Sequence, residues 1–135
     1  MRFLLDTDIC IFIIRKRPQS IFERFKKYPV GDIGISSITY SELCFGAYKS
    51  REPQRNLNAL EEFVAPLEIL AYDASVCHFY GEVRRKLEVI GLPIGPMDTL
   101  IAAHALSQGL TLVTNNTAEF SRVEGLHVEN WVPAE

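Results

Sequence analysis

The stretch from residue 2 to residue 8, RFLLDTD, constrains the fold more than any other part of this chain. Its apolar residues 3–5 are too few for a buried helix and are not interrupted by polar residues, so they predict a central strand covered on both faces of a sheet. Asp6 then lies at the carboxyl end of that strand, where open α/β sheets bind ligands. We interpret Asp6 as a site residue and Asp8 as the N-cap of the next helix, although Asp6 is also a suitable cap.

Further short apolar runs, bounded by turn residues, predict the other strands of the sheet. They are residues 33–35, 67–70, 110–113 and a short last run at 127–129. The segments between them carry helix signals, such as apolar residues at helical spacing and a Pro or Gly at a boundary. The predicted helices cover residues 9–15, 18–27, 38–49, 53–64, 74–90 and the segment from Asp98 to the stop at Gly109. Because strands alternate with helices, we expect an α/β fold with a mostly parallel sheet of four to five strands, formed by residues 1–135 as one domain.

Charge and cysteine content limit the choice of partners and compartment. With 14 basic and 17 acidic residues the net charge is −3, so binding of nucleic acid needs a local basic patch. Two segments, 15–27 and 49–55, are rich in Lys and Arg, and each is either a solvated face or a phosphate contact. Cys10, Cys44 and Cys77 lack CxxC spacing and predict reduced core thiols in a cytosolic protein. The chain also lacks the apolar run of a signal peptide or a membrane span, so we expect neither export nor insertion.

Four acidic residues from four separate segments map to strand ends or to adjacent helix turns. They are Asp6, Glu42, Asp98 and Glu119. The plainer alternatives are a surface position for Glu42 and a favourable interaction of Asp98 with the helix dipole. Asp98, however, shares the apolar face of its helix, which favours a site. His104 lies about 240° around that helix from Asp98, at about 100° per residue, and is a weak catalytic candidate. His78 is expected to be a packing or surface residue.

Carboxylates that converge in this way raise one another's pKa and normally require a compensating cation. Mg²⁺ or Mn²⁺ fits best, because these ions take oxygen ligands and keep several waters, whereas zinc prefers His or Cys. Such an ion activates water and binds phosphate oxygens. The sequence therefore predicts hydrolysis of a phosphodiester or another phosphate ester.

The same residues resemble the PIN-domain ribonucleases and, within them, the VapC toxins of bacterial toxin-antitoxin (VapBC) systems. The resemblance is carried in order by LLDTD at 4–8, SSITYSEL at 36–43, GPMDTLIAAHAL at 95–106, and LVTNN with AEF within 112–120. It implies a three-layer α/β/α fold and Mg²⁺-dependent endoribonuclease activity on structured RNA, transfer RNA first. It also implies a cognate VapB-like antitoxin that blocks the site, and toxin homodimers within the complex.

Residue by residue, the resemblance places Asp6, Glu42 and Asp98 on the three best-marked acidic positions of the family. The chain departs from the pattern at Asp8, where Asn is usual, and at Asn116, where many members have a fourth acid. Glu119, one turn later, is our candidate for that carboxylate. We expect Asp6 and Asp98 to hold the metal, directly or through water. Glu42 and Glu119 would orient its waters, and one of the two would deprotonate the attacking water. Thr114 and Asn116 would position a phosphate or a water that contacts the ligands of the metal rather than the metal itself, and Glu42 is a further candidate for such an outer position.

Two other functions are compatible with parts of this pattern. The motif Asp6-Thr7-Asp8 also matches the DxD of haloacid-dehalogenase phosphatases, in which the first Asp is a covalent nucleophile and the second a general acid. Cys10, however, stands where that family has Thr or Val, and the chain is short for it. A non-catalytic α/β module that binds RNA or protein is the other alternative, with the carboxylates as surface or capping residues.

Overall fold

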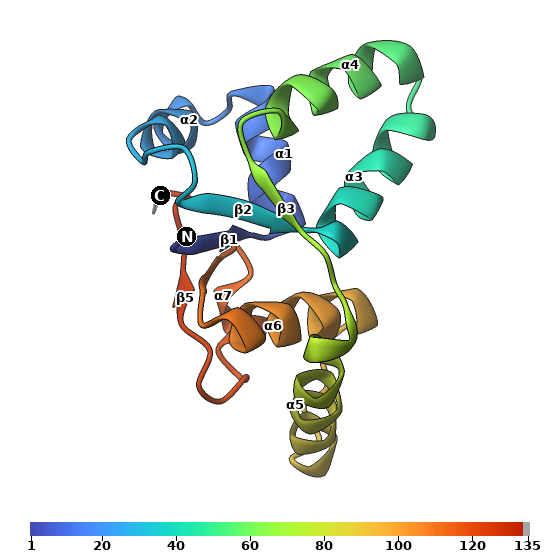
Figure 1. The fold of residues 1–135 in the computed structure, drawn as a ribbon, viewed down its shortest axis with the longest axis vertical. Helices are drawn as coiled ribbons and strands as arrows, with labels where there is room; N and C mark the ends of the chain where they lie inside the picture. Colours follow the sequence, from blue (N-terminus) through green and yellow to red (C-terminus); the bar gives the residue numbers. More distant parts are fainter. Residues whose placement is uncertain (134–135) are drawn as a thin grey trace.

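A computed structural model describes residues 1–133 and contains one five-stranded, entirely parallel sheet in the order β3-β2-β1-β4-β5 (Figure 1). The strands are β1 (Phe3–Leu5), β2 (Ile33–Ser36), β3 (Glu68–Leu70), β4 (Thr111–Val113) and β5 (Val128–Glu129). The predicted α/β fold and all five strand positions are confirmed. Residues 134 and 135, the end of the predicted domain, lie outside the described part.

The strands are short, but β1 is completely buried because it lies in the middle of the sheet. Alternate side chains of a strand point to opposite faces, so Phe3 and Leu5 enter one hydrophobic core and Leu4 enters the other. The first core lies under the helices that follow β1 and β2, and the second lies under those that follow β3 and β4 (Figure 1). The predicted three-layer α/β/α arrangement is therefore confirmed.

The helices match the predicted segments with small differences at their ends. They are α1 (Thr7–Arg15), α2 (Gln19–Lys26), α3 (Ser37–Tyr48), α4 (Pro53–Val64), α5 (Cys77–Val89), α6 (Pro96–Gln108) and α7 (Thr117–Phe120). The predicted helix 74–90 is divided into a 3₁₀ turn, η1 (Ala74–Val76), and α5. The one-turn helix α7 was not predicted, because four residues are too few to show helical periodicity.

Two predictions about single residues were wrong. The N-cap of α1 is Asp6, whose Oδ1 accepts from the amide of Thr7, and Asp8 lies in the first turn. The three thiols are free, but only Cys10 is buried, whereas Cys77 at the start of α5 is exposed. Whether a residue caps a helix or lies in the core depends on which side of the helix faces the sheet. Apolar neighbours in the sequence do not specify that side.

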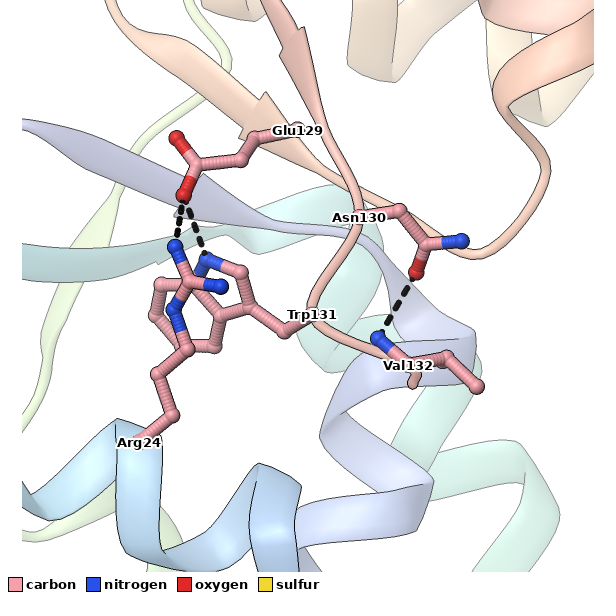
Figure 2. A network of polar contacts seen from close by, with 5 residues as sticks. All are labelled: Arg24, Glu129, Asn130, Trp131 and Val132. Atoms are coloured by element: carbon pink, nitrogen blue, oxygen red, sulfur yellow. Dashed lines mark hydrogen bonds and ion pairs between the residues drawn. The ribbon is translucent and has the colours of Figure 1, made fainter. Parts of the chain in front are cut away.

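The segment after β5 joins the sheet edge to α2 (Figure 2). Glu129 forms an ion pair with Arg24 and accepts a hydrogen bond from the indole Nε1 of Trp131 at 3.0 Å. Trp131 is buried and stacks on Tyr28 with ring centroids 5.4 Å apart. One Arg of the predicted basic cluster is therefore engaged within the protein. In the part of the chain that is described, no helix is long and apolar enough to cross a membrane.

Candidate functional site

Asp6 lies at the carboxyl end of the central strand β1 and is only 5% exposed. Its backbone amide donates to the carbonyl oxygen of Val113 on β4. Its two carboxylate oxygens accept hydrogen bonds at 2.8 Å, Oδ1 from the amide of Thr7 and Oδ2 from the hydroxyl of Thr114. Asp6 is thus both a helix cap and a rigidly held carboxylate at the edge of the sheet. Thr114, which we predicted to position a phosphate or a water, donates to Asp6 itself, a contact that we did not predict.

Glu42 comes from α3, which begins where β2 ends. Ser36 caps that helix by accepting from the amide of Ile38 at 3.1 Å. Glu42 is half-buried in the second turn, and its Oε1 accepts from the hydroxyl of Thr7 at 2.6 Å. We did not predict the role of Thr7 from the sequence. Its position between Asp6 and Asp8 was the one feature that could have indicated it.

Asp98 and Glu119 reach the same edge from α6 and α7. Asp98 is in the first turn of α6, where Pro96 fixes the start of the helix. Glu119 accepts from the amide of Gly95 at 3.2 Å and from the side-chain nitrogen of Asn116 at 2.5 Å. Asn116, which we predicted to position a phosphate or a water, therefore orients Glu119. The contact of Gly95 with Glu119 was not predicted from the sequence.

The pKa values show that the four predicted carboxylates share one electrostatic environment. Burial first, then hydrogen bonding to Glu119 and the charges of Asp6, Glu119 and Glu42, raises the pKa of Asp98 to about 7. Burial, followed by the charges of Asp8 and Glu42, raises the pKa of Asp6 to about 6 despite its two hydrogen bonds. Burial would also raise the pKa of Glu119, but hydrogen bonds from Asp98, Gly95 and Asn116 lower it overall. The site thus concentrates negative charge, although the positive charge of Arg122 also lowers the pKa of Glu119.

Asp8 has a different role from the one we predicted. Its Oδ1 accepts from the amide of Ile9 at 2.7 Å and its Oδ2 from the amide of Asn115 at 3.2 Å. The Asn115 side chain in turn accepts from Asn130. Asp8 therefore connects the start of α1 to the loop after β4, and its charge is the second-largest cause of the raised pKa of Asp6.

The donor set suits a hard divalent cation. No three Asp, Glu, His or Cys side chains within residues 1–133 already surround one point in the manner of a metal cage. Mg²⁺ does not need one, because it keeps several waters and takes one or two carboxylates. Asp6 and Asp98, two acids with raised pKa values, fit this requirement. Neither histidine discussed above joins them: His104 is buried against Ser36, and His78 is exposed on α5.

A groove of about 830 Å³ lies between α1, α3 and α4 and reaches one of the four carboxylates, Glu42. Thr7 and Glu42 line it together with apolar side chains such as Ile11 and Phe45, which are 36% and 65% exposed. It also contains one residue from each predicted basic segment. These are Arg15 and Lys49. The groove thus meets the carboxylate edge at Thr7 and Glu42.

The chain resembles known proteins over nearly its full length. Residues 3–126 match the PIN domain family. The chain is 49% identical over 131 residues to the tRNA(fMet)-specific endonuclease VapC of Shigella flexneri, covering 97% of this chain and 98% of that protein. It also superposes on DNA-bound VapBC from Salmonella typhimurium with a TM-score of 0.92, at 45% identity and with 98% and 99% of the two chains covered.

VapBC2 from Rickettsia felis, solved with a DNA fragment from its promoter, gives a TM-score of 0.91 at 41% identity, with 98% of this chain and 100% of that chain covered. The agreement therefore extends from the central sheet to the helices that carry the four carboxylates. At this level of identity and coverage, sequence and fold assign the protein to the same family. The chain belongs to the PIN-domain family and, within it, to the VapC proteins.

Proposed function

We propose that this protein is the toxin of a toxin-antitoxin pair and a Mg²⁺-dependent endoribonuclease that hydrolyses phosphodiester bonds of structured RNA, with transfer RNA as the first candidate. The observation that carries the proposal is the meeting of Asp6, Glu42, Asp98 and Glu119 in one electrostatic environment. The names of its VapC relatives support the reaction, and the Shigella protein's name supports the substrate.

Asp6 and Asp98 would hold Mg²⁺, with Mn²⁺ as a substitute. The ion supplies a Lewis acid that lowers the pKa of water and neutralises phosphate charge. The protein contributes the positions of the acids: Thr114 and the amide of Thr7 fix Asp6. Glu42 is held by the Thr7 hydroxyl, so its second oxygen is available to orient the attacking water.

Either Glu42 or Glu119 would accept the proton of that water. The lowered pKa of Glu119 keeps it ionised beside Asp98, although it also makes this carboxylate a weaker base. Asn116 and Gly95 hold it in place for this transfer. Attack by water leaves a 5′-phosphate and a 3′-hydroxyl. A mechanism through the ribose 2′-hydroxyl would need a general acid and a general base such as a His pair, and His104 is occupied with Ser36.

Arg15 and Lys49, which line the groove beside Glu42, would contact the RNA backbone. By contrast, Arg24 pairs with Glu129. The ammonium groups of Lys16 and Lys26 lie over the ring of Phe22, as that of Lys49 lies over the ring of Phe45. The VapBC complexes among the relatives support a cognate VapB-like antitoxin as partner. A toxin homodimer within that complex and a cytoplasmic location complete the proposal.

The phosphatase alternative is less compatible with the site. It requires Asp8 to act as a general acid, but both of its oxygens accept backbone amide hydrogens, from Ile9 and Asn115. In a non-catalytic module, the two carboxylates with raised pKa values, Asp6 and Asp98, would have no function. A phosphoaspartate trapped at Asp6 would support the phosphatase. A melting temperature unchanged by Mg²⁺ would support the binding module.

The proposal is tested by incubating the purified protein with total RNA, with Mg²⁺ or with EDTA, and sequencing the new ends. Asp98→Asn should abolish cleavage. The matched control is Glu68→Gln, which changes an exposed carboxylate on the edge strand β3 and should cleave normally. Products ending in a 2′,3′-cyclic phosphate would contradict attack by water, and cleavage in EDTA would contradict the metal.

A further inference from the structure

His104 has no part in the chemistry proposed above, yet it is a polar residue that is only 1% exposed. It lies on α6, six residues after Asp98. Its Nδ1 is 2.8 Å from the hydroxyl oxygen of Ser36, which is completely buried. Ser36 ends β2 and caps α3, the helix that carries Glu42. One buried hydrogen bond therefore joins the two helices that present Glu42 and Asp98.

The surroundings define the direction of this hydrogen bond. The Ser36 oxygen accepts from the amide of Ile38 at 3.1 Å and keeps a second lone pair, so this bond alone does not set the direction. The Ser36 hydroxyl proton does, because within residues 1–133 the acceptor it meets is His104. His104 Nδ1 can accept that proton if the ring is neutral and carries its hydrogen on Nε2. Burial lowers the pKa of His104, more than the charge of Asp73 raises it, which favours the neutral ring.

A second contact holds the same ring against rotation. The amide of Tyr72, just after β3, donates to the hydroxyl of Ser37 at 3.0 Å. The Tyr72 ring then meets His104 edge-on, with centroids 5.6 Å apart and planes at 81°. The start of α3, the segment after β3 and the middle of α6 thus form a closed set of contacts around His104. Buried polar contacts of this kind fix one arrangement of the elements they join.

We propose that His104 is a positioning residue: it accepts a hydrogen bond from Ser36 and so sets the placement of α3 against α6, and with it the placement of Glu42 against Asp98. The inference rests on the proposed nuclease function of those two acids. A misplacement of about 1 Å between catalytic groups costs about a hundredfold in rate, so even a small shift of either helix should be measurable.

Two variants separate positioning from simple packing. His104→Leu fills the space but cannot accept the Ser36 proton, whereas His104→Asn places an amide oxygen near the position of Nδ1. In saturating Mg²⁺ we expect His104→Leu to lose roughly tenfold to a hundredfold in kcat with little change in KM. We also expect it to need several times more Mg²⁺ for half of the rise in melting temperature. His104→Asn should recover most of both losses.

Wild-type kcat and Mg²⁺ response in His104→Leu would overturn the proposal, as would a His104→Asn variant no better than His104→Leu. A third readout needs neither metal nor RNA: the ring nitrogen shifts of His104 in the ¹⁵N-labelled, metal-free protein. We expect an unprotonated Nδ1 and a protonated Nε2 at neutral pH. A proton on Nδ1 would refute the hydrogen bond from Ser36 to His104. This test applies even if His104→Leu fails to fold. If the wild-type protein neither cleaves RNA nor responds to Mg²⁺, the nuclease function fails separately.

Discussion

The metal-free protein should become more stable when Asp6 is replaced by Asn. The cause is the raised pKa of Asp6, from 3.8 to about 6, which burial produces first and the charge of Asp8 second. An acid whose pKa is raised by folding binds its proton more tightly in the folded state. Its ionisation therefore destabilises the fold as the pH rises from about 4 to about 7, and this cost is absent at lower pH.

A shift of about two pKa units corresponds to about 3 kcal/mol, at 1.36 kcal/mol per unit. Asn can keep the cap on Thr7, since it is as good an N-cap as Asp. Its amide group must, however, replace a charged acceptor opposite Thr114, which offsets about 1 kcal/mol. We therefore expect Asp6→Asn to gain about 1 to 3 kcal/mol in the free energy of unfolding at pH 7 and little or nothing at pH 4.

The measurement is urea unfolding in EDTA between pH 4 and pH 8, repeated with Mg²⁺. Bound ion stabilises only the protein that binds it, so added Mg²⁺ should raise the stability of the wild type and leave Asp6→Asn unchanged. Asp73→Asn is the control, because hydrogen bonds from Ser75 lower the pKa of Asp73 instead of raising it. Loss of the Asp73 charge should therefore not increase the free energy of unfolding. An Asp6→Asn protein less stable than the wild type at pH 7 in EDTA would refute the reasoning.

Four further predictions concern single contacts. Thr7→Val removes the donor to Glu42 and should lower kcat about tenfold with less than about 1 kcal/mol change in unfolding free energy, and equal kcat values would contradict it. Asp8→Asn should lower the pKa of Asp6, measured by carbon NMR titration, whereas an unchanged value would be inconsistent with the charge effect. Lys49→Ala should reduce the salt dependence of RNA binding by about one phosphate contact, while Lys27→Ala, outside the groove lining, should not. Trp131→Ala should destabilise by about 3 to 5 kcal/mol in urea unfolding, because this side chain is 4% exposed, and a loss below 1 kcal/mol would show that its packing is dispensable.

The sequence was sufficient for features that depend on local pattern. The apolar run 3–5 identified the central strand because a strand buried on both faces needs uninterrupted apolar residues. Asp6, Glu42, Asp98 and Glu119 could be selected together because parallel strands place their carboxyl ends at one edge of the sheet. The short helix α7 and the division of residues 74–90 were not visible, since they depend on a few residues without a full helical period.

Tertiary structure alone decided how those side chains are held. Thr114 reaches Asp6 across 108 positions, and Ser36 meets His104 across 68. No local pattern encodes such pairs, because they exist only once β1 lies between β2 and β4 and the helices pack on both faces. The choice of Asp6 as cap, against our prediction of Asp8, has the same origin: two acids one residue apart are equivalent in sequence, and only the direction in which the chain leaves the sheet makes them different.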